Sequence, residues 1–137
     1  MSPDEARAFL RENHRGVLVT RRADGGVQTS PVTVGLDGDG MAVISTRETA
    51  YKVRNLRRDP TAVVCAFADQ FFGRPWVQVE GRASILSLPE AMEPLVEYYH
   101  SISGEHPDWD EYRQAMETQR RVLVRIPLEK VGPSRFG

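Results

Sequence analysis

Several features that define common protein classes are missing from the sequence. Its 137 residues include a single cysteine, Cys65, which excludes an internal disulfide and a cysteine-based metal cluster. The apolar residues around it indicate a buried strand, in which cysteine packs as a small hydrophobe. No apolar run approaches the roughly 20 residues of a membrane-spanning helix, and the N-terminus lacks the apolar core of a signal peptide. We therefore expect a cytoplasmic protein that does not enter a membrane.

An excess of one sign of charge is missing as well. The formal net charge is −1, so the protein has no global field that would attract nucleic acid or an anionic membrane surface. We expect neither as a partner. The length and the ordinary apolar content predict one domain, residues 1–137, with a core that needs no disulfide.

Motifs for familiar catalytic chemistries are also absent. The three histidines, His14, His100 and His106, form no i, i+4 pair with a carboxylate on a helix, so we predict no metal site. The sequence has no Walker loop, no Gly-x-Ser-x-Gly elbow and no Gly-x-Gly-x-x-Gly after a strand. Because the carboxylates are scattered, we predict no catalytic side chain, and we expect a bound cofactor to carry the chemistry.

What is present is a series of short strand-like segments separated by turn residues. Ala23-Asp24-Gly25-Gly26 lies between two such segments and predicts a hairpin. The number of these segments and the turns between them predict a mainly β (α+β) fold, a six-stranded antiparallel barrel with short helices at its rim. The expected strands are 16–20, 27–35, one containing Val43 and Ile44, 62–67, 76–86 and 122–131.

Three further segments predict helices through their capping patterns. Ser2-Pro3-Asp4-Glu5 is a capping box that begins a helix ending near Asn13. Ser87 and Glu90 repeat that pattern, although Pro94 predicts that the regular helix begins there. Asp108 and Glu111 begin another helix, and its apolar face is formed by Trp109, Tyr112 and Met116. These aromatic and methionine side chains fit either the core or contact with a partner subunit.

Residues 41–60 combine a strand, a group of hydroxyl residues and a short basic helix. Thr49 is the expected N-cap of that helix, and Pro60 ends it. A helix N-terminus attracts anions, and Ser45, Thr46 and Lys52 add donors beside it. These residues predict a site for one phosphate group; turn residues before a solvated helix are the alternative.

The segment 27–35 has polar residues at the centre of a strand. Pro31 lacks the N–H that a ladder requires, so we expect it at an edge or a bulge. A polar strand centre with a bulge suits a surface that faces a ligand. A plain edge strand explains the same residues, so both interpretations stay open.

Together, several segments carry a resemblance to a known family. They are 16–20 (GVLVT), 28–32 (QTSPV), 52–60 (KVRNLRRDP), 79–83 (VEGRA), and 104–109 (GEHPDW) with 112–116 (YRQAM). With these, the chain resembles the FMN-binding split-barrel superfamily, the flavin and deazaflavin oxidoreductases related to pyridoxamine 5′-phosphate oxidase. It is most similar to PPOX-class members that use the deazaflavin coenzyme F420, the short actinobacterial FDOR-B type.

The resemblance implies a homodimer of six-stranded split barrels with two equivalent sites at the interface. It implies an F420H2-dependent reductase that transfers a hydride to a conjugated enone, a quinone-like compound or another electron-poor small molecule. The cofactor phosphate would lie against Ser45, Thr46 and Lys52, and the ring along 28–32. Trp76 would approach from the partner chain or the opposite barrel wall, and Arg120 and Arg121 would lie toward the site. The full set of expected cofactor-binding residues is Gln28, Thr29, Ser30, Pro31, Val32, Ser45, Thr46, Thr49, Tyr51, Lys52 and Trp76.

Two departures from the family pattern bear on these expectations. Relatives often carry an extra basic residue before the matched lysine, where this chain has Thr49-Ala50-Tyr51; Arg47 is the nearest substitute. How the acidic tail of F420 would be held is therefore open. The chain ends at Gly137 without the Arg-rich segment typical of pyridoxamine phosphate oxidases, so we do not expect vitamin B6 oxidation.

Three alternatives remain beside the main reading. An FMN-binding oxidoreductase would use the same fold with a different cofactor. A non-catalytic module that binds a cofactor or haem would bind tightly without turnover. A nucleic-acid-binding barrel would need a basic groove with stacking aromatics, whereas the basic residues here cluster on one short helix.

Overall fold

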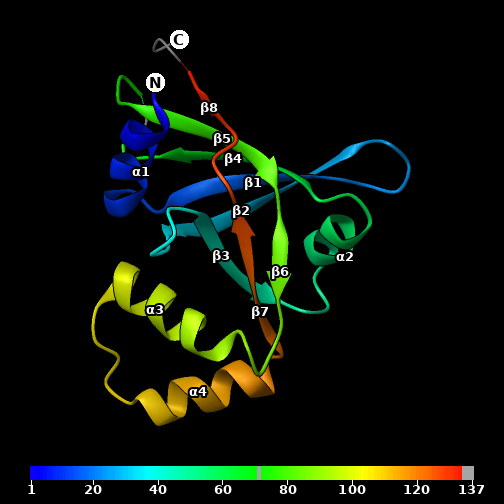
Figure 1. The fold of residues 1–137 in the computed structure, drawn as a ribbon, viewed down its shortest axis with the longest axis vertical. Helices are drawn as coiled ribbons and strands as arrows, with labels where there is room; N and C mark the ends of the chain where they lie inside the picture. The colour runs from blue at the N-terminus through cyan, green and yellow to red at the C-terminus, as the bar shows by residue number, and fades with distance from the viewer. Residues whose placement is uncertain (71, 134–137) are drawn as a thin grey trace.

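The computed structural model describes residues 1–70 and 72–133, which form a mainly antiparallel sheet with four helices (Figure 1). The helices in this part of the chain are α1 (Pro3–Glu12), α2 (Tyr51–Arg58), α3 (Met92–Ser103) and α4 (Trp109–Thr118). The strands are β1 (Arg15–Arg21), β2 (Val27–Leu36), β3 (Ala42–Arg47), β4 (Thr61–Phe67), β5 (Trp76–Arg82), β6 (Ser84–Leu86), β7 (Arg121–Ile126) and β8 (Lys130–Gly132). The mainly β, antiparallel class is thus confirmed.

The strand order requires a strongly curved sheet. The order is β6-β7-β3-β2-β1-β4-β5-β8. Only Ala83 separates β5 from β6 along the chain, yet β6 begins this order and β5 stands near its other end. The two ends of the sheet must therefore approach each other. At this point a side chain on Gly81 would collide with the backbone oxygen of Pro127, so the close approach requires glycine.

The described residues form eight strands where six were expected. The run 76–86 divides at Ala83, where β5 stops pairing with β4 and β6 starts pairing with β7. The final run 122–131 divides after Ile126, because Pro127 cannot donate to the ladder. Each division turns one expected long strand into two short ones.

The capping patterns predicted two of the helix starts correctly. The Ser2 hydroxyl accepts from the Glu5 amide at 3.1 Å, and the Glu5 carboxylate accepts from the Ser2 amide at 3.1 Å. Asp108 caps α4 by accepting from the Glu111 amide at 3.1 Å. Both caps place a side-chain acceptor on an otherwise unpaired helix amide, which is why the local sequence suffices.

The other two helix starts differ from the predictions. The N-cap of α2 is Ala50, one residue after Thr49, because the chain first turns with the Ala50 amide bonded to the Arg47 oxygen at 3.0 Å. The N-cap of α3 is Ala91, so neither the box at Ser87 nor Pro94 sets its start. Pro94 lies in the first turn, where a missing N–H costs nothing. Helix α2 ends at Arg58, before Pro60, as predicted.

Two apolar clusters hold the fold together. The larger lies inside the curved sheet and includes Leu10 of α1 with Leu18, Val64 and Ile126. The second lies between the β3–β7 face of the sheet and the pair α3–α4, which pack side by side below it (Figure 1). Cys65 on β4 is half-buried rather than buried, and burial raises the pKa of its thiol. Within residues 1–70 and 72–133, no helix combines the length and apolar character needed to cross a membrane.

Candidate cofactor site

The site begins where β2 and β3 separate. The two strands pair from Leu36↔Ala42 to Val34↔Ile44 and then part. Before residue 34, β2 pairs with β1, and β3 continues to pair with β7 on its other side. Among the described residues, 31–33 and 45–47 thus face each other across a gap in the sheet. We call this gap the split.

Pro31 fits the split for the reason that the sequence suggested. Although β2 lies inside the strand order, its residues 27–33 form ladder pairs with β1 alone among the described residues. Pro31 is therefore on a strand with one open side, where no neighbour requires its missing N–H. The prediction of an edge is confirmed locally, within a strand that is central elsewhere.

A hollow of about 520 Å³ opens at the split. Its walls come from β2, β3, β7 and the helices α2, α3 and α4, so segments far apart in the sequence meet there. We call the cations Lys52 and Arg121, with the neighbouring Arg47, the basic end, and the tyrosines of α3 and α4 the aromatic end. The two groups adjoin, since Arg121 interacts electrostatically with Tyr98 and Tyr112. The lining residues are Pro31, Val32, Thr33, Ser45, Thr46, Lys52, Tyr98, Tyr99, Tyr112, Met116, Gln119 and Arg121.

The basic end contains cations that lack a carboxylate partner. Arg47 and Arg121 are opposite each other on β3 and β7, and no ion pair within residues 1–70 and 72–133 includes them or Lys52. Burial, and then the charge of Arg121, lower the pKa of Lys52. Burial, and then Arg47, lower the pKa of Arg121. Mutual repulsion of partly desolvated cations is relieved by an anion, so this end is suited to bind one.

The aromatic end is built by α3 and α4. The rings of Tyr99 and Tyr112 lie 5.1 Å apart, and the Tyr112 hydroxyl donates to the Leu95 oxygen at 2.7 Å. Burial raises the pKa of Tyr112 to about 12, so this phenol stays neutral at physiological pH. Tyr112 and Met116 are each 7 % exposed, which places them in the core while their surfaces still line the hollow.

Five of the eleven expected site residues lie together in the hollow. They are Pro31, Val32, Ser45, Thr46 and Lys52. Of the two arginines, Arg121 lines the hollow, whereas Arg120 occupies the turn before β7 with φ 52 and its oxygen accepts from the Glu48 amide.

The remaining expected residues lie elsewhere in the described chain. Gln28 is engaged by α2, since its side-chain oxygen accepts from Asn55 at 2.8 Å. Thr29 is exposed and Ser30 is buried, as the alternation of a strand requires. Thr49 and Tyr51 are exposed, and Trp76 begins β5 opposite Phe67, away from the hollow. Whether a partner chain brings Trp76 to the site stays a prediction.

Sequence reasoning missed several lining residues. Tyr98, Tyr99 and Gln119 were not singled out. Adjacent tyrosines at 98 and 99 were the available signal, because a helix in the core rarely needs two neighbouring hydroxyls. Their proximity to Lys52 depends on tertiary packing, which local patterns do not contain.

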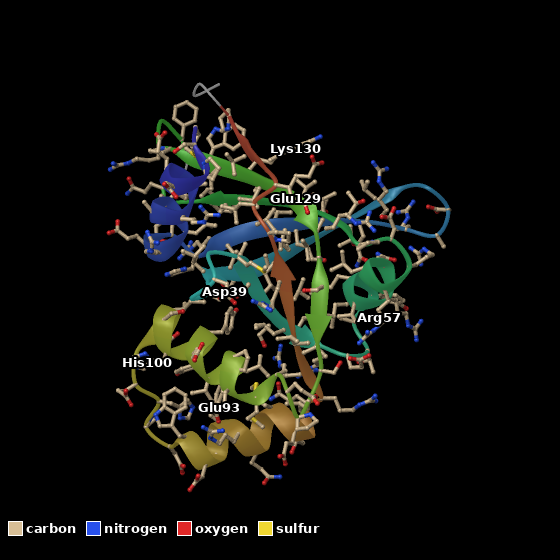
Figure 2. All side chains as sticks on the ribbon, viewed as in Figure 1. Asp39, Arg57, Glu93, His100, Glu129 and Lys130 are labelled. Carbon is tan, nitrogen blue, oxygen red and sulfur yellow. The ribbon has the colours of Figure 1, made fainter. Side chains whose placement is uncertain are left out.

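Two other hollows contain ion pairs of their own. One, of about 800 Å³ between α1 and residues 68–70, 74 and 75, contains the ion pair of Arg15 with Asp69 at 3.1 Å. The other, of about 390 Å³ between the sheet and α3, contains Arg125, which binds Asp37 at 3.1 Å and Asp39 at 2.7 Å. Asp39 lies in the β2–β3 turn, above α3 in the view of Figure 2. The hollow at the split is therefore the better candidate for an anionic ligand.

Known proteins resemble the chain over nearly its full length. It is 30% identical over 131 residues to the F420H(2)-dependent biliverdin reductase of Mycobacterium tuberculosis (strain CDC 1551 / Oshkosh), covering 93% of this chain and 85% of that protein. A conserved hypothetical protein of M. tuberculosis has a similar structure, with TM-score 0.78, 27% identity and coverage of 96% and 82%.

More distant structures share the fold. An F420 reductase matches with TM-score 0.70 at 17% identity, over 92% of this chain and 94% of that one. The haem storage protein of Vibrio cholerae matches with TM-score 0.72 at 20% identity, over 98% and 95%. The family model described as pyridoxamine 5′-phosphate oxidase matches residues 2–134, and the chain belongs to that family.

Proposed function

We propose that the protein is an F420H2-dependent reductase that passes a hydride to an electron-poor small molecule, such as a conjugated enone or a quinone-like compound. The observation that carries the proposal is a group of cations without a carboxylate partner at the open split of the sheet: Lys52 and Arg121 line the hollow, and Arg47 is opposite Arg121. The similarity to a reductase that uses F420H2 supports the choice of cofactor.

The residues at the split fit such a cofactor. Lys52 supplies a charge for its phosphate, while Ser45 and Thr46 supply hydroxyl donors on the adjoining strand. Pro31 and Val32 offer a flat apolar surface for the ring. Reduced F420, when bound, supplies the hydride. The side chains of this protein bind and orient the two reactants, and solvent or the acceptor delivers the proton.

Arg47 is the proposed partner for the acidic tail of the cofactor. It is exposed and lies next to Arg121 across the strand pair. The arginines of α2 are less available: Arg57, on the outer side of that helix in Figure 2, binds Glu48 at 2.7 Å, and Arg58 donates to the Arg21 oxygen at 2.7 Å. Arg47 thus replaces the basic residue that the 49–51 turn lacks.

The proposal includes a homodimer with the site at the interface. If β5 and β6 are counted as one bent strand, and β7 and β8 as another, the eight strands correspond to those of a six-stranded split barrel. The hollow is open, and Trp76 of a second copy would be a candidate to cover it. A cytoplasmic location also stays a prediction.

Fluorescence titration with F420 and, separately, with FMN tests the cofactor. We expect F420 to bind with clear preference and the protein to purify colourless. A clear preference for FMN, or a yellow protein on purification, would overturn the main proposal in favour of a flavin oxidoreductase. Sedimentation should show a dimer, and a fully active stable monomer would contradict an interfacial site.

A haem-binding module is the second candidate, because the haem storage protein shares the fold over 98% of this chain. Titration with haem, followed by an assay of F420H2 oxidation with quinone and enone acceptors, separates the two functions. Tight haem binding without any oxidation of F420H2 would favour the non-catalytic module.

A further inference from the structure

A tyrosine of α3, Tyr98, stands at the closed end of the split. Tyr98 projects from α3 and lines the hollow at the point where β2 and β3 part. Its hydroxyl donates to the Thr33 oxygen at 2.7 Å. The Ser45 amide in turn donates toward that phenol oxygen, which counteracts part of the rise in the pKa of Tyr98 caused by burial. One oxygen atom thus joins both strands.

The register shows what this oxygen replaces. Asp37 is opposite Met41 and donates its amide to the Met41 oxygen at 3.0 Å, and Gly35 is opposite Val43. In an antiparallel pair, every second opposite pair exchanges hydrogen bonds, so the next bonded pair would be Thr33 with Ser45. Those two residues are the ones that Tyr98 bridges. The phenol therefore stands in the place of the next ladder bond.

Close packing of α3 brings the phenol to this place. Ile102, one helical turn after Tyr98, lies over Gly35, where an added Cβ would be 3.0 Å from the Ile102 Cδ1 atom. The same Cβ would lie 3.7 Å from the Tyr98 ring. Residues four apart share one face of a helix, so contact at Gly35 fixes both side chains on β2.

We propose that Tyr98 is a positioning residue that keeps the split open by occupying the bond position between Thr33 and Ser45. Without the phenol oxygen, the Ser45 amide and the Thr33 oxygen would face each other unpaired beside a ladder that already exists. Water in the hollow would be their only other partner, whereas a direct bond continues a ladder that is already formed, so we expect the ladder to extend by one bonded pair. The extension narrows the hollow at the wall that carries Ser45 and Thr46. The inference rests on the proposed function for the identity of the ligand, whereas the expected extension of the β2–β3 ladder does not depend on it.

The test compares Tyr98→Phe, which removes only the oxygen, with the wild type. Ser2→Ala is the matched control, because it removes one hydrogen-bond acceptor from a helix start remote from the split. Titration with F420 is expected to show affinity about tenfold weaker for Tyr98→Phe and within about twofold of the wild type for Ser2→Ala. Unchanged affinity in Tyr98→Phe would overturn the positioning role.

Hydrogen exchange of the free protein gives a readout that needs no ligand. In Tyr98→Phe the Ser45 amide should exchange about tenfold more slowly, since it gains a backbone partner inside a ladder. Unchanged or faster exchange overturns the inference whatever the affinity. If the wild type does not bind F420, the proposed function fails, and the exchange rate of Ser45 alone then decides whether Tyr98 holds the strands apart.

Discussion

Two arginines on the same strand show how differently one charge can be used. Arg125 and Arg121 lie four residues apart on β7 and are both partly buried. Arg125 binds the carboxylates of Asp37 and Asp39 in the turn that joins β2 to β3. Arg121 has Arg47 across from it and Lys52 nearby, and its side chain donates to the neutral Gln119 at 2.8 Å. The first arginine stabilises a turn of the fold, whereas the second is the one that we propose binds a ligand.

The largest expected effect is on F420 affinity, and it concerns the cations that have no carboxylate partner. Lys52→Ala should weaken F420 binding at least about tenfold, because charge-assisted hydrogen bonds contribute roughly 1.5–3 kcal/mol. The melting temperature should stay equal or rise, since the substitution removes a desolvated cation beside Arg121. Fluorescence titration and thermal unfolding measure the two quantities. An unchanged titration would remove Lys52 from the site.

A change at Arg125, which is paired with Asp37 and Asp39, should lower stability and leave F420 affinity nearly unchanged. Arg125→Met keeps most of the apolar stem but removes the charged partner of Asp37, whose side chain is 17% exposed and still accepts from the Asp39 and Met41 amides. We expect a loss of about 1–3 kcal/mol in the free energy of unfolding by urea, with F420 affinity within about twofold of the wild type. A large loss of affinity at unchanged stability would break the distinction between the two arginines.

The pH dependence of stability provides a smaller, directional test. The pKa of Lys52 is lowered in the folded protein from its ordinary value of 10.5, so near that pH the unfolded chain binds more protons at this site. Stability therefore increases with pH as Lys52 loses its proton, in the window from its lowered pKa up to about 10.5. The difference in unfolding free energy between the wild type and Lys52→Met isolates this contribution. If the wild type instead loses stability relative to Lys52→Met as the pH rises through that window, the partly buried environment assigned to Lys52 is contradicted.

The smallest effect is expected beside the site. Thr49 is exposed, lies outside the hollow and does not cap α2, whose N-cap is Ala50. Thr49→Ala should change the free energy of unfolding by less than about 0.5 kcal/mol and F420 affinity by less than about twofold. Asp108→Ala is the contrasting variant: its loss of a true cap should cost about 1 kcal/mol. Equal losses in both would mean that Thr49 does act as a cap.

Local patterns predicted what local interactions determine. The caps at Ser2 and Asp108, the end of α2 before Pro60 and the hairpin turn at Ala23–Gly26 each depend on residues within a few positions. The start of α2 was misplaced by one residue, because a tight turn at Arg47–Ala50 shifts the helix and a hydroxyl residue alone does not reveal it.

The site was only half predictable for a related reason. Lys52 and the hydroxyls of β3 stand out along the chain, as does Pro31. Arg121 and Tyr98 meet them only because β7 pairs with β3 and α3 packs on β2. Such contacts join residues that are far apart in the sequence, and the periodicity of a single segment carries no information on them.

The way in which the hollow is assembled bears on how its specificity could be changed. β6 and β7 are directly paired neighbours, yet residues 87–120 leave the sheet between them to form α3 and α4. The basic end of the hollow belongs to the sheet and α2, while nearly all of the aromatic end belongs to this single excursion. We therefore expect that residues 87–120 can be exchanged as one unit between relatives. We expect a chimera that carries the 87–120 segment of a relative, with tyrosine retained at 98, to keep its cofactor affinity and acquire a different range of acceptors.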